Sequence, residues 1–247
     1  MKSFKMIVLA WIAFLMIQPG FAEEIKVGFE PLPPLIIDKD NGFTIQMLKD
    51  IEKKTDLKFI ITIMPYNRAK YLLKTGEIDL AGHTPYQMET PDFYEYAVDV
   101  DWHVTTKIDI YGTKLEDLVG ETYKSFKKIG TPRGNEDFFS EMFAIPKENF
   151  YVGELGNLVK MVQAKRIDVL LFERSASMST IQKLNISNIN YKMIDDSVKA
   201  SFAVNKNSNG IRLKALLENA IKMIDQKSIF KDFFRYTQLP DQGTVTP

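Results

Sequence analysis

Two segments of this 247-residue chain share one sequence pattern. In residues 68–81 (RAKYLLKTGEIDLA) and residues 159–170 (VKMVQAKRIDVL), apolar residues at helical spacing lead through a polar break into an Ile-Asp pair and an apolar run. Each copy predicts a helix, a turn and a buried strand. Such units are common, so coincidence is the alternative explanation. A true repeat predicts two similar α/β lobes with a cleft between them, where small ligands usually bind.

The rest of the chain alternates between predicted strands and predicted helices. Residues 24–29 and 58–64 read as strands on either side of a helix, and strands that alternate with helices imply a mostly parallel sheet with helices on both faces. We expect residues 104–111 to cross into the second lobe and residues 201–204 to return. The apolar face of residues 211–224 predicts a long helix on the first lobe, and we expect the tail to pack there too.

The N-terminus has the order of an export signal. Residues 1–5 are basic, residues 6–17 are apolar, and residues 20–22 (GFA) supply the small residues that a signal peptidase requires. We therefore expect a signal peptide over residues 1–22, cleavage after Ala22 and a periplasmic location. A retained membrane anchor is disfavoured, because the apolar run is shorter than the roughly 20 residues that span a bilayer.

The composition excludes several classes of function. The chain has no cysteine, which excludes a disulfide framework and a lipid anchor attached through cysteine. Its 32 basic and 32 acidic residues become 30 and 32 when Lys2 and Lys5 leave with the signal. The resulting net charge of about −2 argues against a nucleic-acid or polybasic membrane partner. We expect an exported globular protein that is stabilised by its core.

Several motifs follow one another in an order that resembles a known family. They are VGFE at residues 27–30, NGFTIQML at 41–48, the two Ile-Asp repeats, and IGTPRGN at 129–135. This order resembles the periplasmic solute-binding proteins of ABC importers, in the group that includes polar-amino-acid binders (extracellular solute-binding family 3). The resemblance implies an α/β, type II periplasmic binding protein fold with two crossing strands as the hinge. The implied first lobe is residues 23–107 and 201–247, and the second is residues 108–200.

The implied cleft brings particular residues to a ligand. Glu173 falls where similar amino-acid binders carry an acid that pairs with the ligand ammonium, and a surface ion pair is the alternative. Asn135 precedes a helix whose free N–H groups can hold an acceptor, unless it is an ordinary cap, and Arg133 would offset the acids of the first turn. The further candidates are Glu30, the hydroxyl of Thr84, and three aromatic residues that are also typical of cores, Tyr66, Tyr86 and Trp102.

One position departs from the pattern of the family. Similar binders carry an arginine shortly after the first Ile-Asp strand, and it clamps the ligand carboxylate by two parallel hydrogen bonds. Residues 82–92 contain no arginine, and Glu89 stands about where it is expected. Three alternatives stay open: Arg68 or Arg133 replaces the clamp, the ligand lacks a carboxylate, or the chain has kept the fold and lost the solute.

Enzymatic functions have less support. Without cysteine, and with His83 and His103 as the only histidines, thiol catalysis is excluded and a zinc site is poorly supported. We therefore expect no catalysis, no cofactor and no metal, and predict binding of a small polar solute, an amino acid or related compound, for import through a membrane permease. The alternatives are a ligand-sensing partner of a membrane receptor and, with less support, a small-acid dehydratase that uses Glu173 as general acid.

Overall fold

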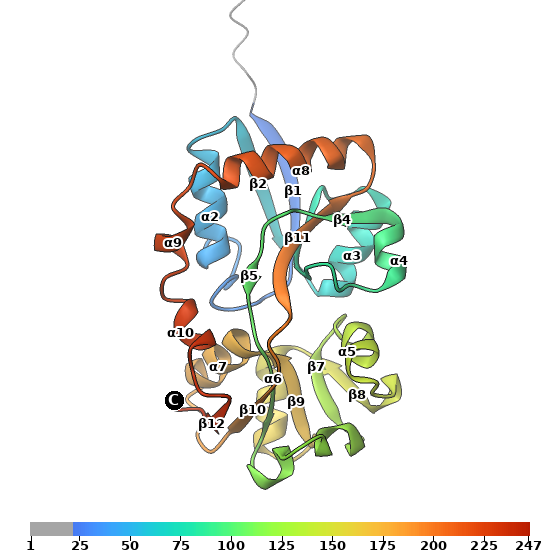
Figure 1. Ribbon diagram of the computed structural model, residues 1–247, viewed down its shortest axis with the longest axis vertical. Coiled ribbons are helices and arrows are strands. Elements are labelled where there is room, and N and C mark those ends of the chain that lie inside the picture. The colour runs from blue at the N-terminus through green and yellow to red at the C-terminus, as the bar shows by residue number, and fades with distance from the viewer. Residues whose placement is uncertain (1–21) are drawn as a thin grey trace, which may run out of the picture.

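The computed structural model describes residues 22–247, which form two sheets one above the other along the long axis (Figure 1). The first sheet has the order β2-β1-β3-β11-β4, and β5 also pairs with β11. Its strands are β1 (Glu23–Phe29), β2 (Leu57–Ile63), β3 (Leu80–Pro85), β4 (Ala97–Asp99), β5 (Val104–Thr105) and β11 (Lys199–Asn205). The second sheet has the order β12-β10-β6-β9-β7-β8. Its strands are β6 (Ile108–Gly112), β7 (Ile129–Pro132), β8 (Phe150–Gly153), β9 (Val169–Glu173), β10 (Asn190–Asp195) and β12 (Gln242–Thr244).

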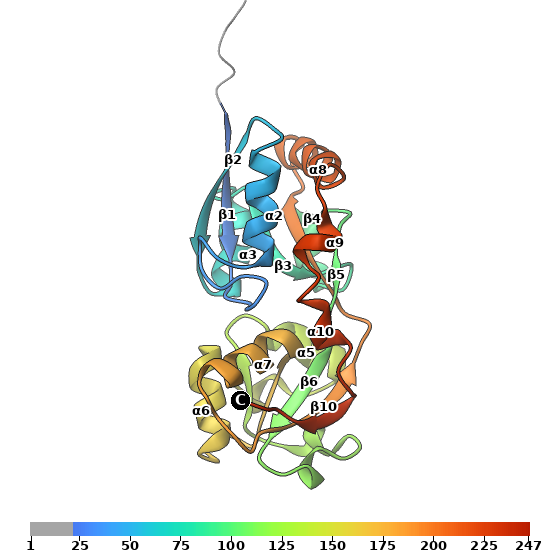
Figure 2. The same cartoon turned by 90° about the vertical axis from the view of Figure 1, so that its left-hand side faces the viewer.

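Helices cover both sheets, so the predicted two-lobe α/β fold is confirmed (Figures 1 and 2). The first lobe carries α2 (Phe43–Glu52), α3 (Tyr66–Thr75), α4 (Pro91–Tyr96), α8 (Ser208–Ile221) and α9 (Gln226–Ile229). The second lobe carries α5 (Glu136–Phe143), α6 (Leu155–Gln163), α7 (Arg174–Lys183) and α10 (Phe234–Thr237), with short 3-10 helices at Glu116–Leu118, Thr122–Ser125 and Lys147–Asn149.

The sheets are mixed rather than mostly parallel. The strands β2, β1 and β3 are parallel, as are β8, β7 and β9, because helices connect them. The strands β11 and β6, which carry the chain across from the other lobe, pair antiparallel with their neighbours. A strand that arrives from the opposite lobe needs no helical crossover from its neighbour. The alternation of strands and helices along the chain therefore does not predict a parallel direction for β6 and β11.

The two repeat copies have the same structure. The first forms α3 and β3, the second forms α6 and β9, and each aspartate holds its strand against the neighbouring one. Asp79 Oδ2 accepts the N–H of Lys26 at 2.8 Å, and the Asp79 N–H donates to the Lys26 carbonyl at 2.8 Å. Asp168 makes the same pair with Lys128, at 3.1 and 2.9 Å. The repeated Ile-Asp therefore fixes the start of a parallel strand in both lobes.

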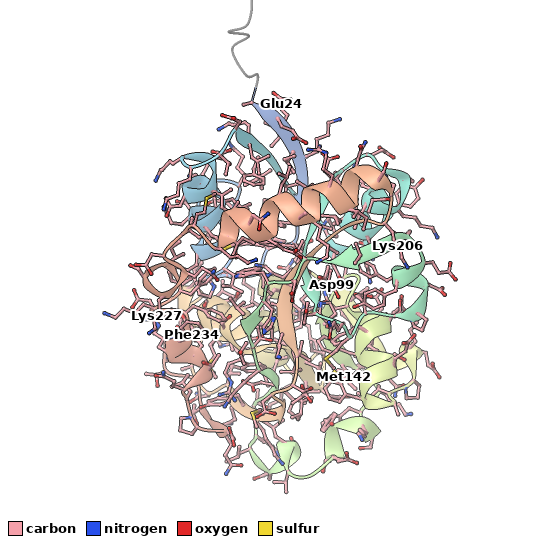
Figure 3. All side chains as sticks on the ribbon, turned by 45° about the horizontal axis from the view of Figure 1, so that its top comes forward. Glu24, Asp99, Met142, Lys206, Lys227 and Phe234 are labelled. Atoms are coloured by element: carbon pink, nitrogen blue, oxygen red, sulfur yellow. The ribbon has the colours of Figure 1, made fainter. Side chains whose placement is uncertain are left out.

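The C-terminal tail lies on the second lobe, contrary to the prediction that residues 201–247 belong to the first. Helix α8 packs on β11, but the chain then runs past both lobes through α9 and α10, where Figure 3 labels Lys227 and Phe234 on the same side of the molecule. Helix α10 contacts α7, and β12 pairs with β10. The side chain of Arg174 donates to the carbonyls of Leu239 and Pro240 at 3.1 and 3.2 Å, which fixes the tail there.

The lobes are therefore joined by three chain crossings. The first two are the predicted strands, from β5 to β6 and from β10 to β11, and the third is the segment between α9 and α10. Among residues 22–247 there is no helix of the length and apolarity that a bilayer span needs. The predicted signal peptide lies outside the described residues, apart from Ala22.

Candidate ligand-binding site

A cavity between the two lobes is lined by residues of both. The free volume inside it is about 50 Å³, below the roughly 300–1,000 Å³ of typical small-molecule sites, so the lobes must move apart to admit a ligand larger than a few water molecules. Its polar lining includes Glu30, His83, Thr84, Asn135, Glu173 and Lys199. Its apolar lining includes Leu32, Ile108, Phe138, Phe139, Phe172 and Val198. The cavity is a mostly apolar chamber with a few polar groups, as is typical of a small-molecule site.

The polar groups converge because strands end at the cavity. Glu30 follows β1, Thr84 lies near the end of β3, Asn135 follows β7 after a short loop, and Glu173 ends β9. Parallel strands present their carboxyl ends at one edge of a sheet, and here those edges of the two lobes face each other. Five of the predicted residues are brought together in this way, since Tyr66 at the start of α3 also lines the cavity.

Glu173 is buried, and only one of its two carboxylate oxygens has hydrogen-bond partners. Its Oε2 accepts from Ser175 Oγ and from the Ala176 N–H, both at 2.7 Å, and so caps helix α7. Its Oε1 is buried without a hydrogen-bond partner, and the residue is 6 % exposed. Burial raises the pKa of Glu173 to about 7, although the Ser175 and Ala176 hydrogen bonds oppose the shift. Glu173 is thus an interior acid with one free oxygen, not the surface ion pair of the alternative interpretation.

Glu30 links the two lobes. Its Oε2 accepts from Asn135 Nδ2 at 3.2 Å, and the same amide donates to the Pro132 carbonyl at 3.3 Å. Burial raises the pKa of Glu30 to about 8, against the opposing effects of Asn135 and Lys70. The Asn135 side chain makes no capping bond to α5, and the Gly134 N–H donates to Glu136 Oε2 at 2.6 Å. Asn135 is therefore a contact between lobes rather than an ordinary cap.

The raised pKa of Glu30 predicts how stability depends on pH. An acid whose folded pKa lies above its unfolded value of 4.5 contributes most stability below pH 4.5, and this contribution is lost as pH rises through about 8. Glutamine does not titrate, so the melting temperature of Glu30→Gln relative to wild type should rise by several degrees between pH 5 and pH 9. Thermal melts across this range test it. The same substitution at the exposed Glu148 should show no such trend in melting temperature. If the melting temperature of Glu30→Gln relative to wild type stays constant or falls with pH, the pKa of Glu30 is not raised in the folded protein.

Glu89, which stands where the clamping arginine is expected, does not line the cavity. Its carboxylate is behind Tyr66, accepting from the Tyr66 hydroxyl at 2.7 Å and from Lys70 Nζ at 3.4 Å. Lys70 lies 4.4 Å from the centroid of the Tyr66 ring and donates across the cleft to the Gly134 carbonyl at 3.2 Å. Glu89, Tyr66 and Lys70 thus hold one another, and two of the three ammonium donors of Lys70 are used within the protein.

Four predicted residues lie outside this cavity. Arg68 is exposed on α3, and Arg133 is exposed and lines a neighbouring cavity that shares Glu30 with the first. Tyr86 donates its hydroxyl to Asp101 at 2.8 Å. Trp102 belongs to the core, where its ring stacks on Phe202 at 4.8 Å between centroids. Neither arginine takes the place of the clamp within this cavity.

Some residues of the site were not predicted. His83 lines the cavity, and its Nε2 lies 2.7 Å from Thr44 Oγ1. Burial among aromatic rings lowers the pKa of His83 to about 3, so the ring is neutral at physiological pH. Phe138, Phe139 and Phe172 form the apolar wall. The position of Phe138 and Phe139 just after the glycine-asparagine loop was the available signal. Among the described residues, no group of three or more His, Asp or Glu side chains is placed to hold a metal ion.

Comparison with known proteins identifies the fold. No family model and no curated protein sequence matches the chain. An ABC uptake transporter substrate-binding protein from Streptococcus pneumoniae, solved with histidine bound, matches at 17% identity and TM-score 0.67, over 90% of this chain and 94% of that one. The ligand-binding core of GluR0 with L-glutamate matches at 16% sequence identity and TM-score 0.69, and the match covers 88% of this chain and 99% of that one. A histidine kinase sensor domain similar to periplasmic binding proteins matches at 16% sequence identity and TM-score 0.67, and the match covers 92% of this chain and 99% of that one. The chain has the fold of these amino-acid-binding and sensory proteins.

Proposed function

We propose that this protein binds one small polar solute, an amino acid or a related compound, in the cavity between its lobes and delivers it to a membrane permease of the ABC type. One observation carries the proposal: a buried, unpartnered carboxylate oxygen of Glu173 and the buried carboxyl group of Glu30 come from different lobes to line one cavity. Buried polar atoms normally have hydrogen-bond partners, so an unpartnered carboxylate oxygen that faces a cavity supports a ligand-binding role for Glu173.

The cellular context that we infer for this function is the periplasm. The basic, apolar and small-residue order of the first 22 residues supports export and cleavage after Ala22. Mass spectrometry of periplasmic material would establish the mature terminus. We infer a binding protein and not an enzyme, in keeping with the binding proteins that share the fold.

A sensory role is the second candidate, since a histidine kinase sensor domain has the same fold. In that case the closed form would contact a receptor instead of a permease. The genes beside the coding sequence discriminate between the two roles, because permease and ATPase genes favour import and a sensor kinase gene favours signalling.

The proposal is tested by thermal stabilisation and then by affinity. A solute that binds only the folded protein raises its melting temperature, so a metabolite library screened against residues 23–247 should contain at least one stabilising compound. Glu173→Gln retains an oxygen for the Ser175 and Ala176 hydrogen bonds and loses the charge. A charge-assisted contact contributes roughly 1.5–3 kcal/mol, so calorimetry should show about ten- to a hundredfold weaker binding of a cationic solute.

The control is Glu148→Gln, the same substitution at an exposed position of the second lobe. Its affinity and melting temperature should equal those of wild type. The Glu173 assignment is wrong if both variants bind the solute as tightly as wild type does.

A further inference from the structure

Most of the side-chain donors that line the cavity are already used within the protein. The Tyr66 hydroxyl donates to Glu89, the Asn135 amide to Glu30 and Pro132, and the Thr106 hydroxyl to the Val198 carbonyl at 2.9 Å. The Thr84 hydroxyl faces Asp99 Oδ1 at 3.4 Å. A ligand that enters this chamber therefore finds few side-chain donors and must bring donors of its own.

The ionisable groups of the lining are mainly acceptors. Glu30 and Glu173 are each at least nine-tenths buried, and Glu173 Oε1 has no partner. His83 is neutral, with its Nδ1 unpartnered, so it offers no positive charge. Among the described residues of the lining, Lys199 alone carries a positive charge. Burial lowers the pKa of His103, and the charge of Lys199 lowers it further; the His103 ring lies tilted against Tyr86 outside the cavity.

A ligand carboxylate would be poorly held under these conditions. Lys70 of α3 does not line the cavity, and it donates to Glu89 and to the Gly134 carbonyl. A ligand carboxylate would lose its water beside two acidic side chains, and Lys199 is the one cation among the lining residues that could compensate it. An ammonium group supplies three donors and one positive charge, the complement of two buried carboxyl groups.

The apolar wall defines the remainder of the ligand. Phe138 and Phe139 from α5 and Phe172 from β9 line one part of the cavity, and Leu32, Ile108 and Val198 line another. Hydrophobic free energy favours a ligand whose body is an alkyl or aryl group that removes these surfaces from water.

We propose that the solute is a primary amine with an apolar body and no carboxylate, bound through its ammonium group to Glu173 and Glu30. This inference rests on the proposed function, and it selects one of the three alternatives that the missing arginine left open. The acidic lining and the occupation of most of its donors carry it, and the unpartnered Glu173 oxygen marks where the ammonium binds.

Matched pairs of compounds that differ by one carboxylate test the inference. Calorimetry on residues 23–247 would compare 2-phenylethylamine with phenylalanine, 3-methylbutylamine with leucine, and histamine with histidine, beside the metabolite library. We expect at least one amine to bind about a hundredfold or more tightly than its amino acid, the difference expected from unfavourable burial of an unpaired charge. Lys199→Met should bind that amine more tightly than wild type, because it removes the one positive charge among the lining residues.

Each contrary result has a distinct meaning. An amino acid that binds more tightly than its amine, or a tight library solute that carries a carboxylate or lacks an amine, overturns the inference and leaves solute binding intact. A tenfold or larger loss of affinity in Lys199→Met also overturns it, because Lys199 would then hold an anionic group. If no compound of either set binds or stabilises the protein, the proposed function itself is contradicted.

Discussion

Replacing Arg174 by alanine is expected to lower the free energy of unfolding by about 3–5 kcal/mol, because it leaves a buried carboxylate without its partner. The side chains of Arg174 and Asp109 are both fully buried. Arg174 Nε donates to Asp109 Oδ2 and its terminal nitrogen to Oδ1, both at 2.8 Å. The variant also loses the hydrogen bonds to the Leu239 and Pro240 carbonyls that hold the C-terminal tail.

Urea denaturation measures this loss, and a double variant separates the unpaired charge from the lost packing. In Asp109→Leu combined with Arg174→Met, no charge remains buried, so the loss should be smaller than in Arg174→Ala. A loss of less than 1 kcal/mol in Arg174→Ala would show that the pair and the tail contacts contribute little to stability.

Gly134→Ala is expected to weaken solute binding about tenfold to a hundredfold while the protein stays folded. Gly134 has a φ of +100°, and an added Cβ would lie 2.4 Å from the backbone nitrogen of Asn67, in the other lobe. Overpacking of this kind costs roughly 1–3 kcal/mol, and the cost falls on the arrangement in which the lobes meet. Separation of the lobes relieves the clash, so the variant shifts the population toward the open form.

The matched control is Gly76→Ala. Gly76 also has a positive φ, of +75°, but nothing lies within 4 Å of its added Cβ. It therefore shares the backbone strain of a left-handed alanine without the contact between lobes. Calorimetry should show weakened binding in Gly134→Ala and wild-type affinity in Gly76→Ala. Equal affinities in the two variants contradict the role of the Gly134 contact.

Much of the fold could be predicted because it depends on local patterns. The Ile-Asp pairs are followed by strands in both lobes, since the apolar run needs burial and the aspartate pairs with the neighbouring strand. The tail was assigned to the wrong lobe because its strand, Gln242–Thr244, is short and polar and has no apolar alternation. Its position depends on the Arg174 side chain and on the edge of β10, which are distant in sequence.

The candidate site was predictable where residues end strands. Glu30, Thr84, Asn135 and Glu173 line the cavity because parallel strands deliver them to the facing edges of the two sheets. Residue type alone was a weaker guide to the site. Trp102 packs in the core, and Tyr66 lines the cavity while its hydroxyl donates to Glu89. The pairing of Glu89 with Tyr66 and Lys70 requires the folded α3, so no short motif indicates it.

Small-angle X-ray scattering measures whether the two lobes close over a solute in the cavity. Wild type and Gly134→Ala would be compared at equal, saturating concentrations of a solute found by thermal screening. We expect bound wild type to be more compact, with the smaller radius of gyration, because only wild type brings Gly134 against Asn67 without a clash. Superimposable scattering from the two proteins, with calorimetry showing equal affinity for the solute, would contradict closure of the lobes over the ligand.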